Sequence, residues 1–115
     1  MKRYPPKSVA VIFCAKCSSI DDAGYNEAAT AMSKLAAQQP GFLGQDHACS
    51  VEGLGITVSY WKDDASAQAW RDQPDHAAIR ERGRDVWYKS YTLHVSRVER
   101  SYDWEKSGIG KNSVA

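Results

Sequence analysis

The sequence predicts an α+β domain with a ferredoxin-like arrangement, in which four antiparallel strands form one sheet and helices cover one of its faces. Three observations predict this fold class. Four segments have the β-branched content or the alternation of strands, two have apolar residues at helical spacing, and the six follow the order β-α-β-β-α-β. At 115 residues the chain has the length of one domain. We expect an extended lead-in over residues 1–8, the folded domain over residues 9–104 and a mobile tail over residues 105–115.

The first strand is expected at Val9–Cys14, where β-branched residues are frequent and both faces are apolar. A helix follows it. Asp21 and Asp22 are suited to cap the N-terminus of this helix, which should end at Gln39 because the residue before a proline is pushed out of the α region. Its apolar stripe recurs at helical spacing. The stripe consists of Tyr25, Ala28, Ala29, Met32, Leu35 and Ala36.

A β-hairpin is expected after this helix. Phe42–Val51 and Leu54–Trp61 are its predicted strands, and Glu52 with Gly53 suits a tight turn between them. Residues in the second of these strands alternate in character with a period of two, so neighbours should face opposite sides of the sheet.

A broken helix and a long last strand complete the predicted sheet. The helix is capped by the aspartate at position 63 or 64 and breaks at Pro74, a residue that suits the first position of a new helical segment. The last strand is expected over Trp87–Tyr102. Its apolar positions change parity near Ser96 and Arg97, which predicts a bulge there.

Helices cover only one face of such a sheet, yet the first strand is apolar on both faces. The simplest cover for the second face is another copy of the same sheet. We therefore expect a homodimer in which two sheets pack into a dimeric α/β barrel.

Composition argues against several classes of protein. The net charge is +1 with basic and acidic residues interspersed, so no nucleic-acid surface is expected. No apolar run approaches the ~18 residues that span a bilayer, and the N-terminal segment does not have the pattern of a signal peptide. Three cysteines, an odd number, argue against a disulfide framework and suit a reducing compartment. The sequence therefore predicts a cytoplasmic protein without a membrane partner.

Cys14 and Cys17 form a C-x-x-C motif. A redox role needs the first thiol at a helix N-terminus, whereas this pair ends a strand. A zinc site would add His47 and Cys49, but the first and second strands are not neighbours in this topology. We expect no metal site, and the role of the three cysteines stays open.

Aromatic side chains gather between residues 53 and 91. Trp61, Trp70, Trp87 and Tyr91 are candidates to line a hydrophobic cavity between sheet and helices, which would bind a flat aromatic small molecule. Large aromatic side chains also dominate ordinary cores, so a purely structural role is the alternative.

His76 is the leading catalytic candidate. It shares a helical stripe with Ile79 and should point at the sheet. Its unperturbed pKa near neutrality suits a base that removes a phenol or enol proton, and its ring is also a potential ligand for a metal or haem iron. The alternative is a structural histidine that caps a backbone group or binds across the interface. Arg80 or Tyr60 would stabilise the anion that proton removal creates.

From about Val9 to Trp104 the pattern resembles the antibiotic biosynthesis monooxygenase (ABM) family of dimeric α+β barrels. The residues that carry the resemblance lie on the predicted strands and the broken helix. They are Pro40-Gly41-Phe42-Leu43, Ser59-Tyr60-Trp61, Trp70, His76, Trp87-Tyr88, Tyr91 and Arg100-Ser101-Tyr102. Members similar to this pattern include cofactor-free oxygenases of polycyclic aromatics, haem-degrading enzymes, small-molecule isomerases and proteins of unknown role.

The resemblance implies first an ABM-type monooxygenase-like enzyme that oxidises an aromatic or quinone-like small molecule without a tightly bound cofactor. One alternative is a haem-binding or haem-degrading member with altered ligation. Haem-degrading members have an Asn on the first strand, which this chain lacks, and their iron-ligating His falls ten residues after Trp70, where Arg80 stands. The other alternative is a non-catalytic dimeric ligand-binding or stress protein.

Overall fold

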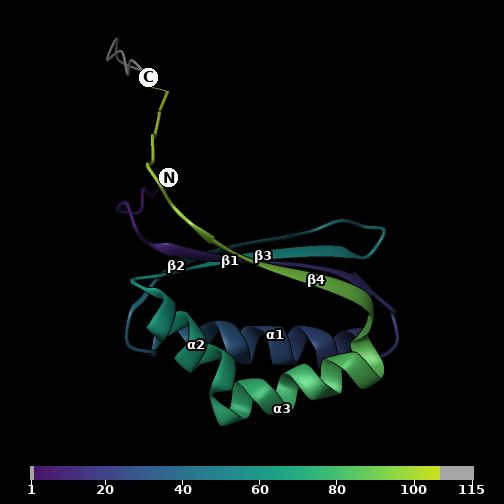
Figure 1. The fold of residues 1–115 in the computed structure, drawn as a ribbon. Coiled ribbons are helices and arrows are strands. Elements are labelled where there is room, and N and C mark those ends of the chain that lie inside the picture. Colours follow the sequence, from purple (N-terminus) through teal and green to yellow (C-terminus); the bar gives the residue numbers. More distant parts are fainter. Residues whose placement is uncertain (1, 107–115) are drawn as a thin grey trace.

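The computed structural model describes residues 2–106, which form a four-stranded antiparallel sheet with helices on one face (Figure 1). The strand order is β2-β3-β1-β4. The predicted α+β fold class is thereby confirmed, with the second helix divided at Pro74 as expected. Most of the predicted tail, residues 107–115, lies outside the described residues. The elements are β1 (Val9–Cys17), α1 (Asp22–Ala37), β2 (Phe42–Cys49), β3 (Leu54–Trp61), α2 (Asp64–Asp72), α3 (Pro74–Arg82), the π-helical turn η1 (Gly83–Trp87) and β4 (Tyr88–Arg97).

Asp21 begins α1 and also ties it to η1. Its carboxylate accepts a hydrogen bond from the backbone N–H of Gly24 at 3.1 Å, as an N-cap should. The other carboxylate oxygen accepts from the indole Nε1–H of Trp87 at 3.3 Å. The predicted cap is therefore correct, and it has a second contact that sequence spacing did not predict.

The turn between β2 and β3 is longer than predicted. Ser50 and Leu54 close the hairpin through a backbone hydrogen bond of 2.8 Å, and Gly53 N–H donates to the Ser50 carbonyl at 3.1 Å. Gly53 has a φ of 90°, which favours glycine. The connection is thus a three-residue loop that ends in a left-handed glycine, and β2 stops at Cys49 instead of Val51.

The last strand is shorter than predicted, and the predicted bulge near Ser96 is wrong. β4 pairs with β1 in an even register up to Arg97, which lies opposite Val9. The irregularity occurs at the other end, where Lys89 is inserted between two paired residues. Beyond Arg97 the backbone of Val98 is still paired: it accepts from Lys7 N–H and donates to the Ser8 carbonyl, both at 2.8 Å, before the chain turns at Lys7, which has a φ of 76°.

The three helices pack against one face of the sheet and leave the other without a helix (Figure 1). The core lies between the helices and the sheet and centres on Trp61, which is 0% exposed and packs against Phe42 and Trp70. On the outer face, Leu54 and Ile56 remain 43% and 38% exposed. The sheet thus keeps an apolar face uncovered, as the two-faced first strand indicated.

In the described part of the chain, no helix is both long and apolar enough to cross a membrane.

Candidate active site

A cavity of about 690 Å³ lies between the inner face of the sheet and the helices. Pockets for small molecules commonly have volumes of roughly 300–1,000 Å³ and mostly apolar walls. Five of the seven predicted site residues line it: Trp70, His76, Arg80, Trp87 and Tyr91. Their catalytic and binding roles remain predictions.

The other two predicted residues, Tyr60 and Trp61, do not line the cavity. Successive residues of a strand face opposite sides of the sheet, so only one of the two can face the helices. Tyr60 lies on the outer face, where its ring stacks on Tyr4 with centroids 3.9 Å apart. Trp61 faces the helices, but it is enclosed in the core and donates its Nε1–H to Ser59 at 2.9 Å.

His76 is fixed against α2 by a stack and a hydrogen bond. Its ring lies on Trp70 with centroids 4.0 Å apart and planes 8° from parallel. Its Nδ1 lies 2.8 Å from the backbone carbonyl of Trp70. Because a carbonyl only accepts, Nδ1 carries the hydrogen of this bond, and in the neutral ring Nε2 has a lone pair. His76 therefore caps a backbone group, as its structural alternative predicted, and it also offers a basic nitrogen.

Burial lowers the pKa of His76 below 6.5, and the charge of Arg80 lowers it further, while the hydrogen bond to Trp70 acts in the opposite direction. A lowered pKa keeps the imidazole neutral at pH 7. Only the neutral ring can accept a proton, so His76 is in the state that a general base requires.

We expect this lowered pKa to make the fold less stable in mild acid. The unfolded His76 has a pKa near 6.5, so below that pH the unfolded state binds more protons than the folded state. The free energy of unfolding of the wild type should therefore decrease as the pH falls from 7 to 5. Urea titrations at a series of pH values should show a smaller decrease in the free energy of unfolding for His76→Gln than for the wild type. Equal decreases in the two proteins would contradict a lowered pKa of His76 in the folded state.

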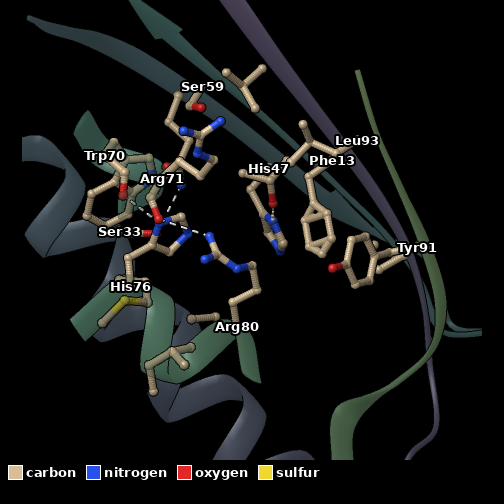
Figure 2. Close-up of a pocket in the computed structure, with 18 of the residues that line it drawn as sticks. Phe13, Ser33, His47, Ser59, Trp70, Arg71, His76, Arg80, Tyr91 and Leu93 are labelled. Carbon is tan, nitrogen blue, oxygen red and sulfur yellow. Dashed lines mark hydrogen bonds between the residues drawn. The ribbon is translucent and has the colours of Figure 1, made fainter. Parts of the chain in front are cut away.

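Arg80 lies beside His76 and is anchored at the same end of α2. Its guanidinium donates to the backbone carbonyl of Arg71 at 2.9 Å, one residue beyond the carbonyl that His76 contacts. Figure 2 shows both side chains on one side of the cavity. A base and a cation are thus held next to each other by consecutive carbonyls of one helix end.

An aromatic wall faces this pair across the cavity. The rings of Phe13 and Tyr91 meet edge to face with centroids 5.1 Å apart (Figure 2). Phe13 also meets Tyr88 edge to face at 5.3 Å. Tyr91 accepts a hydrogen bond from Nε of Arg84 at 2.8 Å. Edge-to-face ring pairs are a favourable arrangement, and together they form a rigid surface for a flat ligand.

Two further phenols, Tyr25 and Tyr88, line the cavity and stay protonated at neutral pH. Burial, followed by the proximity of Cys17, raises the pKa of Tyr25 to about 12. Burial is also the main cause that raises the pKa of Tyr88. Both hydroxyl groups are therefore hydrogen-bond donors and not anions.

Sequence reasoning missed Phe13, Tyr25, Tyr88 and His47 as cavity residues. His47 lies across from Thr57 in the hairpin, and its Nδ1 is 2.7 Å from the Thr57 hydroxyl. The hairpin register would have placed both on the inner face, had the three-residue turn been known. Of the three histidines, His76 and His47 line the cavity.

Gly83 makes room for Tyr88. A Cβ at position 83 would lie 2.4 Å from the Tyr88 ring. We expect Gly83→Ala to displace that ring and to destabilise the fold by about 1–3 kcal/mol, as overpacking does. Thermal unfolding can measure the loss. Gly55→Ala is the matched control, since a Cβ there would meet only the Tyr25 hydroxyl at 3.6 Å, and it should cost little or nothing. Equal effects of the two variants would contradict this prediction.

Within residues 2–106 no three potential metal ligands of the His, Cys, Asp and Glu types lie together. The zinc site considered for Cys14, Cys17, His47 and Cys49 is therefore not formed. The imidazole nitrogens in the cavity that could hold haem iron are Nε2 of His76 and Nε2 of His47.

The protein-family model for antibiotic biosynthesis monooxygenases matches residues 21–82. An uncharacterised Bacillus subtilis protein, YqjZ, is 46% identical over 99 residues, which cover 86% of each chain. Among solved structures, a mutant of SnoaB, a cofactor-independent oxygenase from Streptomyces nogalater, is similar with a TM-score of 0.68 and 11% identity. That similarity covers 90% of this chain and 98% of the SnoaB chain.

A conserved protein from Methanosarcina mazei Go1 is similar with a TM-score of 0.71 and 10% identity, over 78% of this chain and 91% of that one. Identities this low show a shared fold. The family match covers more than half of the chain and includes α1, the hairpin, α2 and α3. The chain therefore belongs to the antibiotic biosynthesis monooxygenase family.

Proposed function

We propose that this protein is an ABM-type monooxygenase that oxidises an aromatic or quinone-like small molecule without a tightly bound cofactor. The observation that carries the proposal is the neutral His76, whose Nδ1 is occupied by the Trp70 carbonyl and whose Nε2 is left as a base in an aromatic-lined cavity. The similarity in fold to SnoaB, a cofactor-independent oxygenase, supports it.

In the proposed reaction Nε2 of His76 removes a proton from a phenolic hydroxyl or an equally acidic position of the substrate. Arg80 supplies a positive charge close to the resulting anion. A fixed charge in a partly desolvated cavity stabilises an anion more than water-exposed charge does. The edge-to-face rings of Phe13 and Tyr91 hold the flat substrate.

The electron-rich anion then reduces O₂ by one electron, and the two radicals combine to form a carbon–oxygen bond. The resulting peroxide loses water as its O–O bond breaks and a ring proton leaves, which gives a quinone. One phenol and one O₂ thus yield one quinone and one water, and no external reductant is consumed.

The direct test is O₂ uptake by the purified protein with a panel of flat phenols and hydroquinones. We expect at least one member to consume one O₂ per quinone formed, with water and not hydrogen peroxide as the second product, without added metal, flavin or reductant. A protein that binds members of the panel but consumes no O₂ with any of them would instead fit the non-catalytic ligand-binding alternative.

Haem binding is the second candidate, and it is favoured by the free Nε2 of His76 in the cavity. The positive charge of Arg80 opposes a further cation at that nitrogen. In a titration with hemin, a saturable Soret shift at one haem per subunit that disappears in His76→Ala would put this candidate first. The absence of a saturable shift would remove it.

The uncovered outer face of the sheet supports a homodimer as the working assembly, with a second copy as the cover. A two-fold axis brings the same face of two copies together, so one apolar face would cover the other. Leu54 and Ile56 are exposed on it, and burial of apolar surface stabilises by about 25 cal/mol per Å².

Ile56→Glu is therefore expected to shift the protein from dimer to monomer, because a charge would be buried against the partner sheet. Sedimentation velocity measures the change. Val51→Glu is the matched control at the exposed hairpin turn, where no loss of dimer is expected. A wild-type protein that is already monomeric at tens of micromolar would contradict the assembly.

A further inference from the structure

Within residues 2–106 Arg80 has no carboxylate partner, whereas two other arginines near it, Arg71 and Arg84, do. Arg71 pairs with Asp72 at 3.0 Å and Arg84 pairs with Glu81 at 2.6 Å, but no ion pair within residues 2–106 includes Arg80. The carboxylate of Asp72 is already taken, because both of its oxygens accept from Arg71, at 3.0 and 3.2 Å. Arg80 is only the last of the causes that lower the pKa of Asp72.

The guanidinium of Arg80 also has N–H donors that no acceptor within residues 2–106 uses. A guanidinium carries five N–H donors in a planar fork, and in the described chain one of them is used, by the Arg71 carbonyl at 2.9 Å. That bond is to the C-terminal end of α2, whose partial negative charge holds a cation in place. The free part of the fork has the shape that binds a carboxylate through two parallel hydrogen bonds.

The charged residues that line the cavity are Asp64, Arg71 and Arg80. The charge of Arg71 is matched by Asp72, outside this set. Asp64 accepts a hydrogen bond from Gln68, one turn along α2. The positive charge of Arg80 is therefore anchored at the cavity wall and left for a ligand to neutralise.

We propose that the cavity binds a hydroxylated aromatic carboxylate, whose carboxylate lies on the free donors of Arg80. Its ring packs against Phe13 and Tyr91, which face Arg80 across the cavity (Figure 2). This inference rests on the proposed function and narrows its substrate class. A phenol without an acidic substituent would leave most N–H donors of the Arg80 guanidinium without an acceptor.

Two probes that differ by one carboxylate test this inference: 2-naphthol and 3-hydroxy-2-naphthoate, whose hydroxyl and carboxylate are adjacent, as His76 and Arg80 are. Their binding to the full chain can be followed by quenching of tryptophan fluorescence and by calorimetry at pH 7.5. Because charge-assisted hydrogen bonds are the strong ones, we expect the carboxylate to bind at least about tenfold more tightly to the wild type. The preference should weaken as salt is added.

The preference should vanish in Arg80→Gln, which keeps an amide donor for the Arg71 carbonyl, and it should be reduced in Arg80→Lys, which keeps the charge without the fork. Arg82→Gln is the matched control on the same helix; it makes the same charge change at an exposed position outside the cavity. Circular dichroism establishes that each variant is folded. If Arg80→Gln does not fold, Arg80→Lys tests the inference, because the preference for the carboxylate should be reduced in it.

If 2-naphthol binds as tightly as the carboxylate, or if Arg80→Gln keeps the preference, the inference is overturned while the proposed aromatic site stands. If neither probe binds, the aromatic site and the inference both fall. A preference that is lost in Arg82→Gln as well would reflect net charge alone and would also overturn it.

Discussion

Replacing Trp61 by alanine is expected to destabilise the fold by about 3–5 kcal/mol, as truncation of large buried aromatic residues does. Trp61 is 0% exposed and packs edge to face against Phe42 with centroids 5.4 Å apart. Alanine would leave a void at the centre of the core and would remove the hydrogen bond to Ser59. It would also remove the ring beside Trp70, which lines the cavity. Urea unfolding monitored by circular dichroism measures the loss.

Trp104→Ala provides the matched control, because that tryptophan is 58% exposed and its removal should change stability by less than about 0.5 kcal/mol. Trp61→Phe should fall between the two, since it keeps a ring but not the indole N–H. A loss below about 1 kcal/mol for Trp61→Ala would mean that the centre of the core lies elsewhere.

The fold class was predictable because its signals are local. The cap at Asp21 and the break at Pro74 each depend on a few neighbouring residues, and both were found as expected, whereas α1 ends at Ala37 and not at the predicted Gln39. The end of β4 at Arg97 was not predictable in this way, because it is set by where β1 begins. The placement of Trp87 in a π-helical turn was also missed; the backbone N–H of Tyr88 closes this turn by donating to the Gly83 carbonyl.

The residues of the candidate site show the same difference between local signals and signals that depend on distant parts of the chain. His76 was expected at the cavity because helical spacing alone aims it at the sheet, whereas Trp70 and Arg80 were proposed for their chemistry and from the family resemblance; all three line the cavity. To place a strand residue, one must also know whether the odd-numbered or the even-numbered residues of that strand face the helices. Without that fact Tyr60 was expected in the site, whereas it lies on the outer face, and His47 was considered only as a zinc ligand.

His76→Asn is expected to lower kcat by roughly 10²–10⁴-fold for a phenol that the O₂-uptake panel identifies, which is the usual contribution of a general base. The asparagine amide can still donate to the Trp70 carbonyl in place of Nδ1, but nothing replaces the lone pair of Nε2. Loss of the base alone should leave KM nearly unchanged, because the aromatic wall of Phe13 and Tyr91 stays intact. Steady-state O₂ consumption measures both constants.

Variants of the other two histidines test whether the loss of kcat is specific to His76 or follows from replacing any imidazole. His94→Asn alters an imidazole outside the cavity, opposite Ile12 on the outer face of the sheet, and should not change kcat while sedimentation velocity shows that the dimer is retained. His47→Gln alters the other imidazole of the cavity, and a loss there equal to that of His76→Asn would assign the base to β2. An unchanged kcat in His76→Asn would leave His76 with its structural role alone, the capping of α2 through the Trp70 carbonyl. The cavity would then need another base, and Tyr25 and Tyr88 do not qualify, because burial raises the pKa of each phenol further above neutrality.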